Sequence, residues 1–142
     1  MTVESSASTT WEGDLVHGNG SVRPASGAFP ELALTWNNRA ASRATGTSPE
    51  ELIAAAHSGC FSMALANGLA GAGHAPERLD VTARVSFAAG EGITGIHLNV
   101  KGKVAGIDTA VFTAAVEDAK ANCPVSKALA AVPITAEATL EL

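Results

Sequence analysis

The segment from Ser48 to about Gly71 constrains the fold most, because it is the longest apolar stretch and has a clear helix start. Ser48 suits the N-cap, Pro49 the first helical position and Glu51 the third, which is the pattern of a capping box. Apolar residues then occupy nearly every face of the predicted helix: Leu52, Ile53, Ala55, Ala56, Cys60, Phe61, Met63, Ala64, Leu65 and Leu69. Because one sheet covers only one face of a helix, we expect a second layer, for which another subunit is one source.

This apolar segment is poor material for a membrane span, since polar residues interrupt it and it is rich in Gly and Ala. The N-terminus has neither the basic nor the apolar region of a secretory signal. The net charge of −5 leaves no basic face for a phosphate backbone. We therefore expect a cytoplasmic protein that has neither a membrane nor a nucleic acid as a partner.

The rest of the chain predicts strands and shorter helices. Residues 9–36 read as an antiparallel meander with a turn at Gly18-Asn19-Gly20, and residues 37–47 as a polar loop. Alternation with period two predicts a hairpin of residues 79–88 and 95–104, and a last strand over 133–142. Helices are predicted over 109–122, with Val111, Phe112, Ala115, Val116 and Ala119 facing inward, and over 124–131.

These elements, without an internal repeat or a linker, indicate one α+β domain over residues 1–142. We expect antiparallel sheets around the long central helix, with residues 1–8 flexible.

The two cysteines stand in unequal settings. Cys60 lies in the middle of the apolar helix, whereas Cys123 directly precedes Pro124 at a predicted N-cap, where the helix dipole and free amides lower a thiol pKa. Local electrostatics therefore favour Cys123 as the thiolate, because the dipole fades within the first turn and does not reach Cys60. A cation that activates Cys60 must come from elsewhere, and the candidates are Arg39, Arg43 and Arg23. In a reducing cytoplasm such a pair is most often two free thiols or a transient, redox-active disulfide.

Other interpretations of these residues stay open at this point. A cysteine inside an apolar helix is commonly a small core residue. His57 lies three residues before Cys60, on the same side of the helix, so it is either a structural histidine or half of a Cys-His pair. A metal site is disfavoured, because there is no C-x-x-C and His57, Cys60 and Cys123 supply at most three ligands. The glycines follow no nucleotide-binding pattern, so we expect no metal and no organic cofactor.

From Gly46 to Leu65 the sequence resembles the OsmC/Ohr family of hydroperoxide-reducing proteins, and most closely its OsmC branch. The similarity continues at Trp11-Glu12-Gly13-Asp14, at residues 106–108 and at residues 119–126, so it covers nearly the whole chain. The resemblance implies an intertwined homodimer with a thiol peroxidase site at the subunit interface. It also suggests an organic hydroperoxide as substrate and a dithiol reductant, of lipoyl type, as the partner that resets the enzyme.

The resemblance assigns roles to four residues. Cys60 would be the peroxidatic cysteine, Cys123 the resolving one and Glu50 the active-site carboxylate. Arg39 takes the place of the family arginine, although one extra residue before Pro49 leaves Arg43 or Arg23 possible.

Helix geometry adds a constraint on the carboxylate. Ten residues of helix span about 15 Å, so Glu50 cannot touch Cys60 of its own helix. We therefore predict that Arg39 and Glu50 reach the Cys60 of the other subunit.

Three functions follow from these patterns. The first is a peroxidase that prefers alkyl peroxides, since Phe61 and Met63 make the surroundings of Cys60 apolar. The second is a stress or ligand-binding protein of the same fold without efficient turnover. The third is a hydrolase that uses Cys60 and His57.

Overall fold

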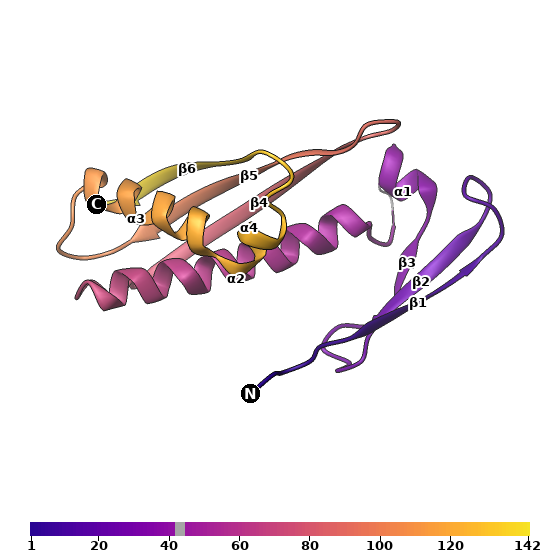
Figure 1. Cartoon of the computed structure of the whole chain (residues 1–142), viewed down its shortest axis with the longest axis horizontal. Coiled ribbons are helices and arrows are strands. Elements are labelled where there is room, and N and C mark those ends of the chain that lie inside the picture. The colour runs from indigo at the N-terminus through magenta and orange to yellow at the C-terminus, as the bar shows by residue number, and fades with distance from the viewer. Residues whose placement is uncertain (42–44) are drawn as a thin grey trace. The chain divides into compact units, whose positions relative to one another are not determined.

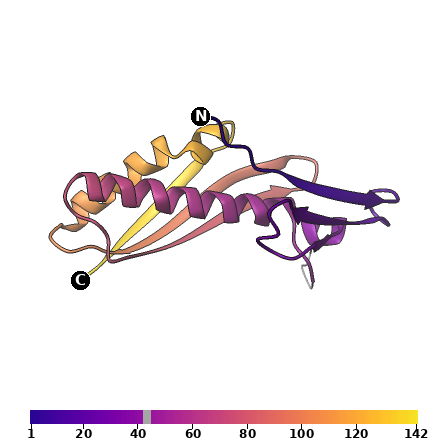
Figure 2. The ribbon, with the colours of Figure 1, turned by 90° about the horizontal axis from the view of Figure 1, so that it is seen from below.

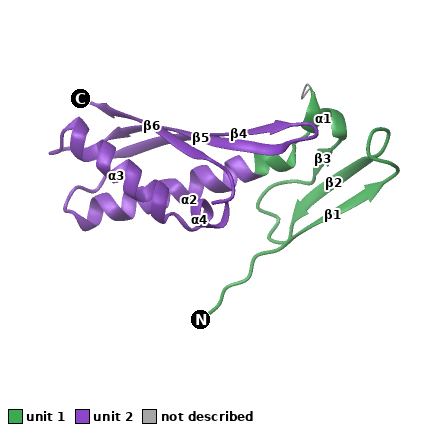
Figure 3. Ribbon diagram, turned by 45° about the horizontal axis from the view of Figure 1, so that its top comes forward, with its two compact units in different colours: residues 1–52 green, residues 53–142 purple. Residues whose placement is uncertain are grey.

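A computed structural model describes residues 1–41 and 45–142 of the protein. The chain divides into two compact units, residues 1–52 and 53–142 (Figure 3). The long helix α2 (Pro49–Gly71) begins in the first unit and continues through the second. The single domain over residues 1–142 stays a prediction.

The first unit contains a three-stranded antiparallel meander, as predicted, in the order β1 (Ala7–Glu12), β2 (Asn19–Pro24) and β3 (Leu32–Leu34). The predicted turn was wrong, because Asn19 and Gly20 lie in β2 and pair with β1. The chain reverses earlier, where Gly13 has a φ of 92° and the Asp14 carboxylate accepts the amide of His17 at 2.7 Å. β1 already starts at Ala7, so the last two of the residues expected to be flexible are paired with β2.

A short helix, α1 (Trp36–Ala40), lies in the segment predicted to be a loop. The hydroxyl of Thr35 accepts the backbone amide of Asn38 at 3.1 Å and so caps the helix. The loop prediction was wrong here because this cap stabilises a helix too short to show periodicity. α1 carries Arg39, whereas Arg43 lies outside the described residues.

The second unit contains a mixed sheet in the order β4-β5-β6. β4 (Arg78–Ala88) and β5 (Gly92–Lys103) form the predicted antiparallel hairpin, and β6 (Ile134–Glu141) pairs with β5 in parallel. The expectation of antiparallel sheets was therefore wrong for β6. The chain returns to the start of β5 through α3 (Thr109–Asn122) and α4 (Pro124–Ala128), and a helical crossover of this kind gives parallel strands. The α+β class is confirmed.

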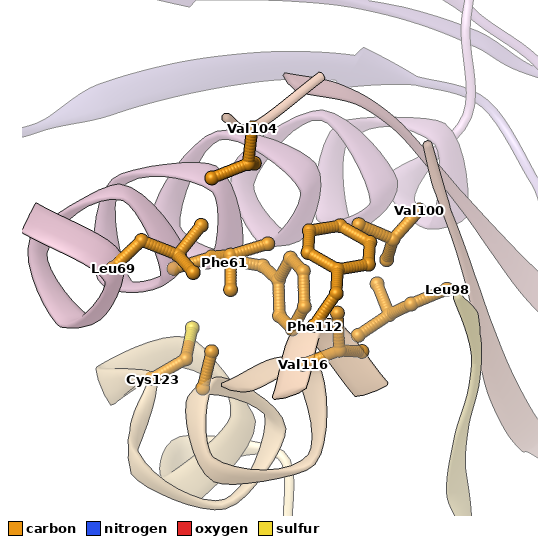
Figure 4. Close-up of a cluster of buried hydrophobic side chains, with 10 residues drawn as sticks. Phe61, Leu69, Leu98, Val100, Val104, Phe112, Val116 and Cys123 are labelled. Carbon is orange, nitrogen blue, oxygen red and sulfur yellow. The ribbon is translucent and has the colours of Figure 1, made fainter. Parts of the chain in front are cut away.

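The helices α2, α3 and α4 cover one face of this sheet (Figures 1 and 2). A buried line along α2, at intervals of four residues, meets the inner residues of α3 and β5 in the core (Figure 4). The core side chains include Phe61, Leu65, Leu69, Leu98, Val100, Phe112 and Val116. Val111, predicted to face inward on α3, is 49% exposed because the buried stripe runs through Phe112, Val116 and Ala119 instead.

Within the second unit α2 buries the side that carries Phe61, Leu65 and Leu69, whereas Met63 on another side is 76% exposed. By length and composition alone α2 could cross a membrane. Core helices pass the same test, and α2 packs its buried line on the helices and sheet of the second unit. The predicted second layer over the exposed side stays a prediction.

Candidate functional site

Cys60 and Cys123 come together in the second unit as two free thiols. Cys60 is half-buried on α2, and Cys123 is fully buried between the end of α3 and the start of α4. The sulfur of Cys123 points toward α2 (Figure 4). Cys60 and Cys123 are close enough that each thiol shifts the pKa of the other. The structure thus joins the two cysteines that lie far apart in the sequence.

The two thiols differ in their readiness to ionise. Burial raises the pKa of Cys60 and the neighbouring Cys123 raises it further, against the opposing influence of the Val125 amide. Burial also raises the pKa of Cys123, but the Ser126 amide, the Cys60 thiol, the Ser126 hydroxyl and the Val125 amide together bring it below the usual value. The opposite directions of these two shifts agree with the prediction from local electrostatics, which favours Cys123 as the thiolate.

A groove of about 510 Å³ opens on the Cys60 side of this pair. Its walls are largely apolar and come from α2, α3 and the start of α4. The lining residues are Cys60, Met63, Ala64, Asn67, Gly68, Asp118, Ala119, Asn122 and Pro124. Cys60 is therefore accessible to a small molecule, whereas Cys123 lies behind it in the core.

Arg39 and Glu50 form a bidentate ion pair in the first unit. Arg39 Nε donates to Glu50 Oε1 at 3.1 Å and Oε2 at 3.2 Å, and Arg39 Nη2 donates to Oε2 at 2.9 Å. The carboxylate is almost fully buried, while the arginine side chain is 34% exposed. Such a fork fixes the plane of the guanidinium. The positive group is thus held rigidly at a position where its side chain is partly exposed.

The segment between α1 and α2 holds this pair in place. The amide of Thr47 donates to the carbonyl of Ala33 at 2.9 Å, and the Asn38 side chain donates to the Thr45 carbonyl at 2.5 Å. Gly46 has a φ of 78°, and a side chain there would collide with the Ala33 carbonyl and the Asn38 amide group. Glycine at this position therefore allows the close approach that brings α1 beside the start of α2.

Of the three candidate arginines, Arg39 is the one paired with Glu50. Arg23 instead interacts with Thr10 and Glu31 on the strands, and Arg43 is not among the described residues. A cavity of about 220 Å³ adjoins Arg39, and most of its lining is apolar: Trp11, Leu15, Leu34, Thr35, Trp36 and Pro49. The first unit thus offers a fixed cation next to an apolar surface.

His57 is fully buried and takes part in a different contact from the one considered in the sequence. Its Nε2 lies 2.8 Å from Ser126 Oγ, and its Nδ1 has no hydrogen-bond partner among the described residues. Neither nitrogen is paired with Cys60, so the arrangement required by a Cys-His hydrolase is not formed. Burial lowers the pKa of His57 and keeps the ring neutral.

Ser126 is a residue of this site that the sequence interpretation did not identify. It follows the N-cap Cys123 by three residues, the separation at which an N-cap side chain and the third helical residue meet. This spacing is the feature of the sequence from which Ser126 could have been identified. In residues 1–41 and 45–142 we find no group of three or more His, Cys, Asp or Glu residues placed to hold a metal ion.

Comparison with known proteins agrees with the fold and with the sequence motifs. The family model described as OsmC-like protein matches residues 42–137. The chain belongs to this family. The protein named Peroxiredoxin OsmC from Escherichia coli (strain K12) is 43% identical over 134 residues, which cover 92% of this chain and 93% of that protein.

Solved structures support the OsmC fold. An OsmC-like protein from Mycoplasma pneumoniae has a TM-score of 0.72 at 14% identity, with all of both chains covered. The organic hydroperoxide resistance protein OhrB of Bacillus subtilis has a TM-score of 0.68 at 23% identity, covering 96% of this chain and 98% of that chain. The family assignment made from the residue motifs is confirmed.

Proposed function

We propose that this OsmC-family protein is a cysteine-based peroxidase that reduces organic hydroperoxides to alcohols. The observation that carries the proposal is the meeting of Cys60 and Cys123 beside an open, largely apolar groove. The names of its relatives support it, since one is a peroxiredoxin and another an organic hydroperoxide resistance protein.

In this reaction the thiolate of Cys60 attacks the outer oxygen of the O–O bond. The bond breaks, the alkoxide takes up a proton and leaves as the alcohol, and Cys60 becomes a sulfenic acid. The thiol of Cys123 then condenses with the sulfenic acid, which forms a disulfide and releases water. An external dithiol, for which a lipoyl-type reductant is our candidate, returns both cysteines to thiols.

Within the second unit, burial and the neighbouring Cys123 raise the pKa of Cys60, so the first step requires a cation from outside this unit. We infer that Arg39 supplies it, with Glu50 fixing the guanidinium. A positive charge near Cys60 would lower the thiol pKa and stabilise the departing alkoxide.

Glu50 and Cys60 lie on the same helix, ten residues or about 15 Å apart. The ion pair would therefore act on the Cys60 of a second subunit in an intertwined homodimer. The exposed apolar side of α2, which includes Met63, suits such a contact.

The apolar cavity beside Arg39 supports alkyl hydroperoxides as the substrate class. An alkyl or aryl group could bury its surface against Trp11, Leu15 and Trp36, while the peroxide oxygens approach the guanidinium. Hydrogen peroxide has no such group to bury. We expect a higher kcat/KM for cumene hydroperoxide than for hydrogen peroxide, and equal values would contradict this substrate preference.

The decisive experiment treats the reduced protein with one equivalent of cumene hydroperoxide. We expect mass spectrometry to show the loss of two hydrogens and, after proteolysis, a disulfide that joins the peptides of Cys60 and Cys123. Cys60→Ser should consume no peroxide. Cys123→Ser should consume one equivalent and then stop without sustained turnover.

Two other outcomes would overturn the peroxidase assignment. A ligand-binding protein without turnover would leave the peroxide unconsumed. A hydrolase based on Cys60 would retain its hydrolytic activity in the Cys123→Ser variant.

A further inference from the structure

We propose that His57 and Ser126 are positioning residues for Cys123, which hold a hydrogen-bond donor on its thiolate and so speed disulfide closure. This inference rests on the proposed peroxidase function. It assigns a task to two buried polar residues that the mechanism described above does not use.

The geometry connects three residues in a row. His57 is 0% exposed and Ser126 is 4% exposed, so their 2.8 Å hydrogen bond lies in the interior. Ser126 is the third residue of α4, in the turn that starts at the N-cap Cys123. A hydrogen bond from its hydroxyl is among the causes that lower the pKa of Cys123. A series of polar contacts therefore leads from the His57 imidazole on α2, through the Ser126 hydroxyl, to the Cys123 thiol.

The hydrogen-bonding capacity of a neutral imidazole determines which group donates and which accepts in this series of three residues. A neutral imidazole has one N–H and one lone pair, and buried N–H groups without a partner are rarer than unpaired acceptors. Since Nδ1 has no partner in the described part of the chain, the proton belongs on Nε2, which donates to Ser126. The hydroxyl then has its own proton available for the sulfur of Cys123.

The closing step gains from that donor. The thiolate of Cys123 gives an electron pair to the sulfur of the Cys60 sulfenic acid, so an S–S bond forms as the S–O bond breaks. The hydroxide combines with the proton released when Cys123 ionised, and water leaves. No oxidant beyond the peroxide is needed. Among the described residues, Cys60 is the titratable neighbour of Cys123, His57 is bonded to Ser126, and Asp118 of α3 lines the adjoining groove.

The experiment compares His57→Leu, which removes the donor, and Ser126→Ala with a matched control, His57→Gln. A glutamine can place an N–H near the position of Nε2, so we expect it to retain most of the effect. The pKa of Cys123 is measured from thiolate absorbance in a Cys60→Ser background. The rate of disulfide closure is measured separately, after one equivalent of cumene hydroperoxide.

We expect His57→Leu and Ser126→Ala each to raise the pKa of Cys123 by about one unit, as loss of a hydrogen bond to a charged group does. Closure should slow about three- to fourfold at a pH below that pKa, because the smaller thiolate fraction is partly offset by the higher nucleophilicity of a more basic thiolate. Oxidation of Cys60 should keep its rate, so a trapped sulfenic acid should accumulate. Combining the two substitutions should add little, because both interrupt one chain.

An unchanged pKa of Cys123 in either folded variant would overturn the proposal, as would equal slowing of both steps. If His57→Leu does not fold, Ser126→Ala decides alone by the same criterion. The pKa measurement uses no peroxide. A failure of the proposed peroxidase function would therefore appear as absent peroxide consumption, whereas a failure of this inference would appear in the thiolate titration.

Discussion

The two compact units carry different parts of the chemistry. The first holds a cation, Arg39, whose guanidinium is fixed by a buried carboxylate and lies next to an apolar cavity. The second holds two thiols and a buried His57–Ser126 hydrogen bond. The first unit therefore has a fixed positive charge but no cysteine, and the second has two cysteines, of which the accessible one, Cys60, has a raised pKa.

This difference shows where activation is missing. The N-terminus of α4 lowers the pKa of the buried Cys123, whereas burial raises the pKa of the accessible Cys60. A chain on its own would thus favour the thiol that peroxide does not reach. In the proposed mechanism, Arg39 of one subunit lowers the pKa of Cys60 in another subunit and so makes the accessible thiol the reactive one.

The largest effect is expected from removal of that cation. Arg39→Met should lower kcat/KM for cumene hydroperoxide about 10²- to 10³-fold, the usual cost of losing a donor that stabilises developing charge. Arg39→Lys should restore only part, since lysine lacks the bidentate fork that matches Glu50. Steady-state peroxide consumption measures both. Arg23→Met, which removes an exposed arginine of the strands, is the matched control and should behave like the wild type.

Mixed dimers would test whether the cation comes from the other subunit. Under this mechanism, homodimers of Cys60→Ser are inactive and homodimers of Arg39→Met keep only the residual activity predicted above. A mixed dimer joins the intact arginine of one subunit to the intact cysteine of the other, so we expect one working site of the two. Mixed dimers with no more than this residual activity would place Arg39 and Cys60 of a working site in the same subunit and contradict the proposed exchange.

A smaller loss is expected for Glu50→Gln. The amide can still accept one hydrogen bond from Arg39, but it loses the charge and the bidentate geometry that fix the guanidinium. We expect a roughly tenfold fall in kcat/KM for the alkyl hydroperoxide, the scale of a misplaced catalytic group. Glu51→Gln, in the next position of the helix, is the matched control. A similar loss in both variants would indicate damage to the helix start instead.

Much of the fold could be predicted because its elements have strong local patterns. The cap at Ser48 and the alternation of β4 and β5 allowed these elements to be placed within a few residues. The parallel pairing of β6 could not be predicted, since it depends on where the α3 and α4 crossover returns the chain. In the thiol site, the two cysteines could be identified from the sequence because a thiol is reactive in itself. Ser126 could not, because its contact with His57 forms only when α4 packs against α2.

The close approach of α1 to α2 predicts a loss of stability in Gly46→Ala. Alanine there must adopt a positive φ and also push away the Ala33 carbonyl and the Asn38 side chain. We expect a cost of about 1 to 3 kcal/mol in the free energy of unfolding. Gly27→Ala is the matched control, because Gly27 has a φ of 69° but no atom within 4 Å of an added side chain. Equal losses in urea unfolding would mean that the close approach adds nothing to the backbone strain.

The smallest effect concerns the pH dependence of stability. Burial lowers the pKa of His57, so below the ordinary histidine value of about 6.5 the unfolded chain takes up a proton that the folded protein refuses. The unfolded state then binds more protons, and stability falls as the pH decreases through this window, by at most about 1.4 kcal/mol per pH unit.

His57→Gln should flatten this part of the curve between pH 7 and pH 5 in urea titrations. Equal slopes in the wild type and His57→Gln would show that the buried ring is not the group that resists protonation.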